Sequence, residues 1–204
     1  MLIIKSKFKI AKRLGAAVFE KTQTQKFALS EARFASSKRR GGRGGSDYSR
    51  QLLEKQRVRF TYGLSERQLS NYAGQAFHEK DPSAALHKSL EMRADNAIYR
   101  AGFSSTRRAA RQAVSHGHIL INGKRTTTPS HHVKKGDVIS IREGSRRSPL
   151  FAGLTEADQD RARNIPQWLS VDMPLMKAEV KAEPSYNPVE AGLDYSTVFE
   201  FYSR

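Results

Sequence analysis

The segment TRRAARQAVSHGHILINGKR, residues 106–125, constrains the fold of this chain more than any other. Its first half combines cations with alanines in the rhythm of a helix. At about 100° per residue, Arg107, Arg108 and Arg111 fall on one arc, and the alanines fill the opposite one. We therefore predict a helix over roughly 107–116 that buries a thin apolar face and exposes three guanidinium groups together.

The second half of the segment predicts a β-hairpin. Residues 119–121 form a short apolar run, ILI, that suits a buried strand. Asn122-Gly123 is the strongest two-residue hairpin signal, because both residues tolerate positive φ. Lys124 and Arg125 then begin the return strand. We expect the cations at both ends of the segment to lie on one surface, with the apolar middle behind them.

Similar signals extend this unit over residues 93–149. A short helix is expected over 93–100, with Gly102 as its C-terminal cap. Ser104-Ser105-Thr106 supplies hydroxyl caps for the helix that follows. A second glycine-containing turn precedes an alternating strand at 138–141. The unit is therefore predicted to hold two helices followed by a small antiparallel sheet.

Residues 46–92 predict a small helical domain. Ser46 or Asp47 suits the N-cap of a first helix, and Ser65 begins a second. Asp81-Pro82 marks the start of a third, since proline is favoured in the first helical turn.

The two ends of the chain have a different character. Residues 1–45 are expected to form a basic flexible arm, because 36–45 contains no apolar side chain to bury. Prolines interrupt 150–204, so we predict an extended wrap that completes the helical domain. Within it, 156–163 has a helical pattern and 198–202 a strand-like one.

Charge is segregated along the chain. The net charge is +16, and residues 1–60 and 93–149 contribute +12 and +9, whereas 61–92 and 150–204 contribute −1 and −4. A chain that only needs to be soluble intersperses its charges. The pattern favours one face on nucleic acid and another on solvent or protein partners.

Composition excludes several function classes. The chain contains no cysteine, which excludes disulfides, thiolate catalysis and cysteine-based zinc sites. No apolar run of about 18 residues is present, so no membrane span is expected. The apolar start, residues 1–4, is too short for a signal peptide, although an organellar transit peptide stays open. No glycine-rich phosphate loop or nucleophile constellation is found, so we expect no enzyme.

Several motifs resemble, in order and spacing, the S-four-type RNA-binding domain: RADN at 93–96, RRAARQ at 107–112, SHGH at 115–118, NGK at 122–124 and GDVI at 136–139. Upstream, SDY at 46–48 and LEKQRVR at 53–59 are similar to the family of bacterial-type small-subunit ribosomal protein four. The resemblance covers 46–204 well and 1–45 loosely.

The resemblance implies an α+β fold. A helical domain, residues 46–92 completed by the wrap 150–204, would carry the RNA-binding domain, residues 93–149, as an insertion. It also implies a structural component of the small ribosomal subunit, without enzymatic activity, that binds small-subunit rRNA. Binding is expected at a multi-helix junction of the five-prime domain, early in assembly.

The same resemblance implies partners and a location. Neighbouring small-subunit proteins, including protein five, and messenger RNA near the channel where it enters would lie close by, in a cytoplasmic or organellar ribosome. Some family members hold zinc through four cysteines. Because this chain has none, we expect no metal and no other cofactor.

Candidate RNA contacts follow from the cations and from the helix start. Proteins recognise duplex RNA mainly by shape and backbone, and the arginine fork bridges phosphate oxygens. The hydroxyl caps would place helix amides against a phosphate. The candidate set is Lys38, Arg39, Arg40, Arg43, Arg50, Lys55, Arg57, Arg59, Arg67, Ser104, Ser105, Thr106, Arg107, Arg108, Arg111, His116, Lys124 and Arg125.

Each motif also has a structural interpretation. The arginines of 107–111 would form a solvated helix face, and Tyr72 a core residue rather than a stacking one. His116 and His118 are a weak metal signal without a nearby carboxylate, so polar or RNA contacts are favoured. Asp95 stands alone, which favours a structural hydrogen bond or ion pair within the helix pair over catalysis.

Three other functions compete with the ribosomal one. The main alternative is a free-standing RNA-binding factor with an S-four-type domain, but such factors usually lack a helical block like 46–92. An enzyme guided by this domain, such as a pseudouridine synthase, would need a separate catalytic domain. DNA binding through charge alone predicts no preference for structured RNA.

Overall fold

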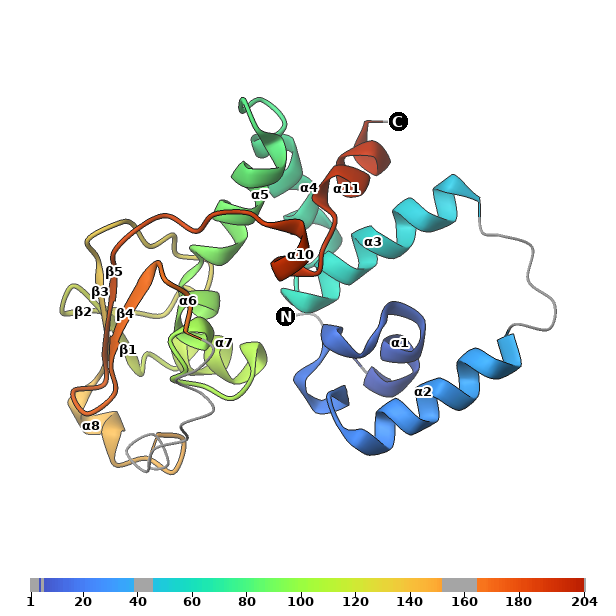
Figure 1. Ribbon diagram of the computed structural model, residues 1–204. Helices are drawn as coiled ribbons and strands as arrows, with labels where there is room; N and C mark the ends of the chain where they lie inside the picture. Colours follow the sequence, from blue (N-terminus) through green and yellow to red (C-terminus); the bar gives the residue numbers. More distant parts are fainter. Residues whose placement is uncertain (1–3, 5, 39–45, 152–164, 204) are drawn as a thin grey trace. The chain divides into compact units, whose positions relative to one another are not determined.

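The computed structural model in Figure 1 describes residues 4, 6–38, 46–151 and 165–203. The chain divides into two compact units, Met1–Leu86 with Tyr186–Arg204, and His87–Ser185. The second unit is therefore inserted into the first. One unit is helical and the other contains an antiparallel sheet, which confirms the predicted α+β class.

The first unit is built from helices with clear N-caps. It holds α3 (Asp47–Thr61), α4 (Glu66–Ala76), α10 (Pro188–Ala191), α11 (Tyr195–Tyr202) and the first part of α5 (Pro82–Glu91). The Ser46 hydroxyl accepts from the backbone amide of Ser49, and Ser65 forms a capping box with Gln68. The helix starts predicted from these serines are confirmed.

The strand predicted over 198–202 was wrong, because this segment is helix α11. Asp194 caps the helix by accepting from the amide and hydroxyl of Thr197. Tyr195 and Val198 are fully buried, and their i, i+3 spacing is helical. The aromatic and β-branched composition of the segment resembles a strand, but α11 packs mainly against α3.

A charged cluster holds α11 in place. The Lys55 ammonium donates to Glu66 Oε1 at 2.7 Å and lies 4.1 Å from the centre of the Phe201 ring. The Tyr202 hydroxyl donates to the same carboxylate oxygen at 3.0 Å. Burial tends to raise the pKa of Glu66, but the hydrogen bonds from Lys55 and Tyr202 outweigh it and hold this pKa below its ordinary value.

Acid is expected to weaken this cluster. Because the pKa of Glu66 is lower in the folded state, its stabilising contribution is complete above the ordinary carboxyl value of 4.5 and is lost as the pH falls below it. The Glu66 side chain is 45% exposed, so solvent screening limits the effect to about 1 kcal/mol or less. Unfolding of wild type and Glu66→Gln, followed from neutral to acid pH, should show a shallower acid dependence in the variant. Identical pH profiles would contradict the assignment.

The N-terminal segment is helical rather than a flexible arm. It contains α1 (Lys7–Leu14), the short 3₁₀ turns η1 (Ala16–Val18) and η2 (Glu20–Thr22), and α2 (Gln25–Lys38). These elements bury an apolar cluster made of Ala11, Leu14, Val18, Phe19 and Phe27. The flexible arm was predicted from the glycine- and arginine-rich residues 36–45, whereas the apolar residues earlier in the segment form this cluster. Residues 39–45 lie outside the described part of the chain.

The second unit places two helices against a five-stranded sheet. Its elements are α6 (Ala94–Arg100), α7 (Arg107–Ser115), β1 (Ile119–Ile121), β2 (Lys124–Thr126), β3 (Val138–Ile141), α8 (Glu143–Arg146), β4 (Leu169–Asp172) and β5 (Lys177–Val180). The sheet is antiparallel, with strand order β2-β1-β3-β5-β4. Figure 1 shows α6 and α7 beside this sheet.

Both predicted helices of this unit and its hairpin are confirmed. Gly102 and Gly117 follow α6 and α7 with φ of 79° and 71°, the left-handed conformation that ends a helix. Asn122 and Gly123 adopt positive φ in the turn between β1 and β2. Ala110, Ala113 and Val114 form the buried face of α7, and the two alanines allow close packing against α6.

Residues 165–185 contribute two strands to the sheet of the second unit, although a wrap on the helical domain was predicted for this segment. β5 pairs with β3 in the register Ile139↔Ala178, and β4 pairs with β5. Ala178 and Val180 alternate with exposed residues, which is the pattern of a half-buried strand. The prolines lie outside both strands, so they delimit a hairpin. The helix predicted over 156–163 lies outside the described residues.

Candidate nucleic-acid interface

The start of α7 combines an N-cap with a run of arginines. Thr106 Oγ1 accepts a hydrogen bond from the amide of Ala109 at 3.1 Å, so Thr106 is the cap, and Ser105 beside it is exposed. No acidic residue occupies the first turn of α7. The positive end of the helix dipole and Arg108 therefore lie together at a surface that suits an anion.

The arginines of α7 differ in their exposure, contrary to the prediction that all three are presented together. Arg108 is exposed, whereas Arg107 and Arg111 are half-buried and bind side chains of α6. Both flank the buried face of α7, so their long side chains reach the neighbouring helix before they reach solvent.

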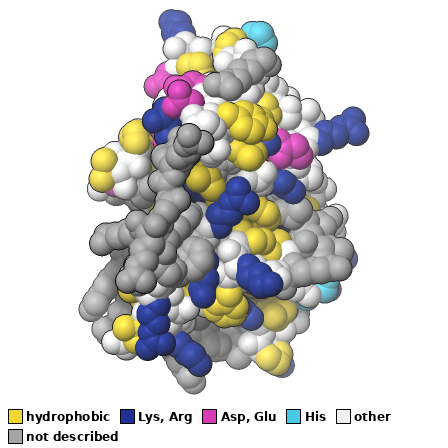
Figure 2. Space-filling model, turned by 90° about the vertical axis from the view of Figure 1, so that its right-hand side faces the viewer, with side chains coloured by type: hydrophobic (Ala, Val, Ile, Leu, Met, Phe, Trp, Pro, Cys, Tyr) yellow, Lys and Arg dark blue, Asp and Glu magenta, His cyan; other side chains and the backbone are white. Residues whose placement is uncertain are grey.

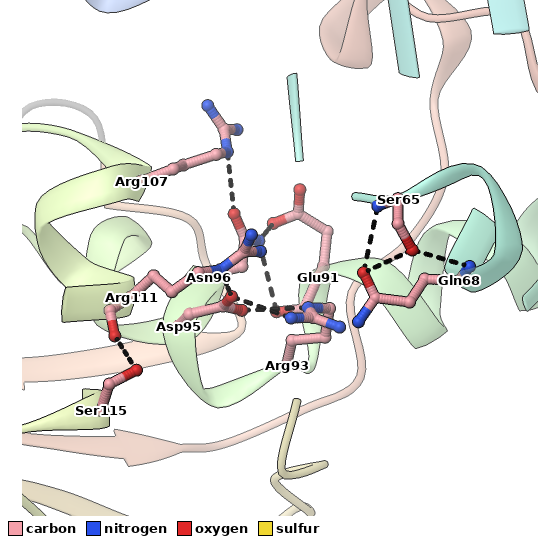
Figure 3. Close-up of polar contacts among 9 residues, drawn as sticks. All are labelled: Ser65, Gln68, Glu91, Arg93, Asp95, Asn96, Arg107, Arg111 and Ser115. Carbon is pink, nitrogen blue, oxygen red and sulfur yellow. Dashed lines mark hydrogen bonds and ion pairs between the residues drawn. The ribbon is translucent and has the colours of Figure 1, made fainter. Parts of the chain in front are cut away.

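Arg111 binds a buried carboxylate that a second arginine also binds. Its Nε donates to Asp95 Oδ2 at 2.7 Å. Arg93 donates to the two oxygens of Asp95 at 3.0 and 2.9 Å, and the side chains of Arg93 and Asp95 are 3% and 4% exposed. The structural ion pair predicted for Asp95 is confirmed, and Figure 3 shows both arginines directed at this residue.

Arg107 is held by a neutral side chain. Its Nε donates to Asn96 Oδ1 at 2.9 Å, and its guanidinium carbon lies 4.3 Å from the centre of the Tyr99 ring. Asn96 Nδ2 in turn donates to Glu91 Oε2 at 2.8 Å, and Arg100 binds both oxygens of Glu91. Figure 3 shows this chain of contacts running from Arg107 through Asn96 to Glu91.

The hairpin brings a further cation to the opposite end of α7. Arg125 Nη2 donates to the backbone carbonyl of His116 at 3.2 Å, and its guanidinium lies directly over Gly117. A side chain at Gly117 would collide with Arg125. Arg125 thus lies at the end of α7 opposite to Arg108, with Lys124 exposed beside it, and a single surface shared by the helix and hairpin cations stays a prediction.

His118 lies in the same positively charged region. Its Nδ1 is 2.9 Å from the Ser145 hydroxyl. Burial lowers the pKa of His118, and the charges of His116, Arg142 and Arg125 lower it further. Among the described residues, no group of three or more His, Asp or Glu side chains could hold a metal ion.

Two lysines outside the predicted set of RNA contacts are also exposed here. Lys134 and Lys135 precede β3 in a turn that side chains fasten to the hairpin. Asp137 accepts from Asn122 Nδ2 at 2.8 Å and from the amide of Lys134 at 2.7 Å, and Asn122 Oδ1 accepts from the amide of Val138. The sequence signal that could have identified these two cations is the Lys-Lys pair directly before Gly136-Asp137.

The first unit offers fewer exposed cations than predicted. Arg50 and Arg67 are exposed, whereas Arg57 and Arg59 are half-buried beside Glu54 and Glu66. Lys55 was predicted to contact RNA, but its side chain is only 8% exposed and contacts Glu66 and Phe201 as described above.

Figure 2 shows one face on which Lys and Arg side chains lie between apolar ones, with acidic side chains toward the top of the view.

Tyr72 is half-buried in α4. The side chain of Lys38, together with Arg39, Arg40 and Arg43, lies outside the described residues.

Comparison with known proteins gives two family matches. The model described as "Ribosomal protein S4/S9 N-terminal domain" matches residues 3–92, and the "S4 domain" model matches residues 92–139. A small ribosomal subunit protein uS4 from Roseiflexus castenholzii is 40% identical over 199 residues, which is 96% of each chain. The chain belongs to the uS4 family.

Other uS4 relatives agree over the same length. Those from Chromobacterium violaceum and Acinetobacter baumannii are each 39% identical, with 97% of both chains covered. The N-terminal uS4 match begins at residue 3 and therefore includes α1 and α2, which the sequence resemblance covered only loosely. None of the helices in the described residues is both long and apolar enough to cross a membrane.

Proposed function

We propose that this chain is a structural constituent of the small ribosomal subunit that binds small-subunit rRNA directly. As a member of the uS4 family it is a ribosomal protein, not an enzyme. The observation that carries the proposal is the cationic surface of the second unit. It comprises the α7 start with Arg108, the hairpin cations Lys124 and Arg125, and the inner arginines Arg107 and Arg111.

This surface suits an RNA backbone. Duplex RNA presents phosphates and 2′-hydroxyls at a shallow groove, and arginine can donate two parallel hydrogen bonds to one phosphate. Ser104 and Ser105, beside the cap Thr106, would add hydroxyl donors where the α7 amides face a phosphate. Arg50 and Arg67 would provide an additional RNA contact on the first unit. His116, Lys134 and Lys135 would enlarge the RNA contact of the second unit.

The finer location is part of the same proposal. The binding site would be a multi-helix junction in the five-prime domain of the rRNA, where binding begins subunit assembly. Ribosomal protein five and messenger RNA near its channel would be neighbours, and the bacterial cytoplasm the compartment. A free-standing RNA-binding factor is less favoured, because residues 3–92 match the N-terminal-domain model in addition to the S4 domain match.

The test is binding of the purified chain to five-prime-domain rRNA at increasing salt, with transfer RNA and duplex DNA of equal mass as competitors. We expect the rRNA complex to outlast both competitors by about 100-fold or more and to weaken steeply with salt. Equal competition by all three nucleic acids would reduce the interaction to charge alone and overturn the proposal.

A further inference from the structure

Helix α3 has two faces that contact different neighbours. One face packs against α11, through contacts such as that of Lys55 with the Phe201 ring. The other face packs against α1, which Figure 1 shows beside α3. It is formed by side chains that fall within about 100° of arc on the helix: Leu52, Leu53, Gln56 and Phe60.

Helix α1 covers this second face only in part and leaves a pocket of about 320 Å³. The same four side chains of α3 line the pocket, together with Ile10, Arg13 and Leu14 of α1. Arg13 is exposed, so it lies at the rim, whereas Leu14 is buried. Small-molecule pockets have volumes of roughly 300–1,000 Å³, so this one suits a single ring system and is too small for a helix or strand.

The lining of the pocket is apolar except for Gln56 and Arg13. Gln56 Oε1 accepts a hydrogen bond from Arg59 Nη1 at 3.1 Å, which fixes the orientation of the amide and leaves its Nε2 to serve as a donor for a ligand. The Phe60 ring is held by its neighbours, because its centre lies 6.3 Å from that of Phe19 and 5.3 Å from the Arg59 guanidinium carbon.

An unpaired nucleobase matches this combination of groups. Its faces stack on aromatic and aliphatic side chains, its edge carries hydrogen-bond acceptors, and its nucleotide brings a phosphate that a guanidinium can bind. Lys9 is exposed one helical turn from Arg13, and α1 contains no acidic residue that would repel the phosphate. An apolar protein side chain would also fill the pocket, but it would accept nothing from the Gln56 amide.

We propose that this pocket receives an unpaired nucleobase of the bound RNA, with Phe60 against its ring, Gln56 at its polar edge and Arg13 on the adjoining phosphate. The inference rests on the proposed function and adds to it a contact that reads a base instead of the backbone. A multi-helix junction can supply such a base, because the nucleotides that link its helices are not all paired.

The first experiment fills the pocket without changing the charge of the protein. Leu52→Trp places an indole at the pocket wall, where Leu52 is half-buried. Affinity for five-prime-domain rRNA should fall about 10-fold, as expected for one lost stacking contact, with an unchanged log–log salt slope. The matched control is Leu29→Trp, at a leucine of α2 that is 61% exposed and outside the pocket, and it should bind as wild type does.

Two further variants test the polar groups in the same titration. Gln56→Leu removes the amide and should lower the affinity about 5-fold with an unchanged salt slope. Arg13→Gln should lower the affinity and also reduce the slope by about 0.7–0.9, the value for one phosphate. Wild-type affinity of Leu52→Trp or of Gln56→Leu would overturn the proposal.

The second experiment detects the base directly and requires no variant to fold. Wild-type protein is titrated with adenosine monophosphate, uridine monophosphate or ribose 5-phosphate, and the side-chain NMR signals of Leu53 and Phe60 are followed. At least one mononucleotide should shift both signals with a Kd of about 1 mM, whereas ribose 5-phosphate, which lacks a base, should shift neither. Equal shifts with ribose 5-phosphate, or none with either mononucleotide at about 10 mM, would overturn the proposal.

Failure of the pocket and failure of the proposed function give different results. If transfer RNA and duplex DNA compete equally with rRNA for wild-type protein, the proposed function is overturned and the inference falls with it. If wild-type protein prefers rRNA and Leu52→Trp retains the full affinity, the function stands and only the pocket assignment is overturned.

Discussion

Asp95→Ala is expected to lose about 3–5 kcal/mol of the free energy of unfolding, because it leaves the Arg93 guanidinium buried without its carboxylate. The side chain of Arg93 is only 3% exposed. Arg111 would lose its bond to α6 in the same variant. The measurement is chemical denaturation followed by circular dichroism.

Two further variants make this result specific. Asp47→Ala removes a surface partner of Arg50, where both side chains are more than half exposed, and should cost less than about 1 kcal/mol. Combining Asp95→Leu with Arg93→Met removes both buried charges and should recover much of the stability. Wild-type stability of Asp95→Ala would contradict the role of this pair.

Substitution of Arg108, Lys124 and Arg125 by Gln is expected to weaken rRNA binding by about 10- to 100-fold at moderate salt. These three side chains are the exposed cations at the two ends of α7 and on the hairpin, and each lost phosphate contact lowers the salt slope by about 0.7–0.9. Folding should be preserved because the side chains are exposed. The measurement is the same salt-dependent titration of five-prime-domain rRNA.

A charge-matched control distinguishes a site from general attraction. Lys80, Lys177 and Lys181 are also exposed cations, but they lie outside α7 and the hairpin. Their triple substitution by Gln removes the same net charge and should leave most of the affinity intact. Equal losses in the two triple variants would mean that overall charge, and not this surface, carries the binding.

Local signals predicted the parts of the fold that local chemistry decides. Helix α7, its glycine stop and the Asn122-Gly123 turn were all identified, because caps, left-handed positions and short apolar runs act within a few residues. The same holds for the capping box at Ser65. The apolar alternation of β5 is equally local, but the prolines around it favoured an extended segment over a hairpin.

Long-range contacts explain what the sequence could not reveal. Arg107 and Arg111 were predicted to be exposed because a helical wheel does not contain α6, whose Asn96 and Asp95 bind them. Lys55 was predicted to contact RNA, yet its partners include Phe201 at the far end of the chain. In each case a cation was assigned by type, whereas its neighbours in space determine whether solvent reaches it.

The insertion of one unit into the other also sets an order of events. A chain made from its N-terminus offers the whole of His87–Ser185 before residues 186–203 exist. Until then the hydroxyl of Tyr62 lacks its contact with Tyr195, and Gln51 lacks its bond to Glu200. The inserted unit can therefore fold during synthesis, whereas the helical unit is completed only when α11 has been translated.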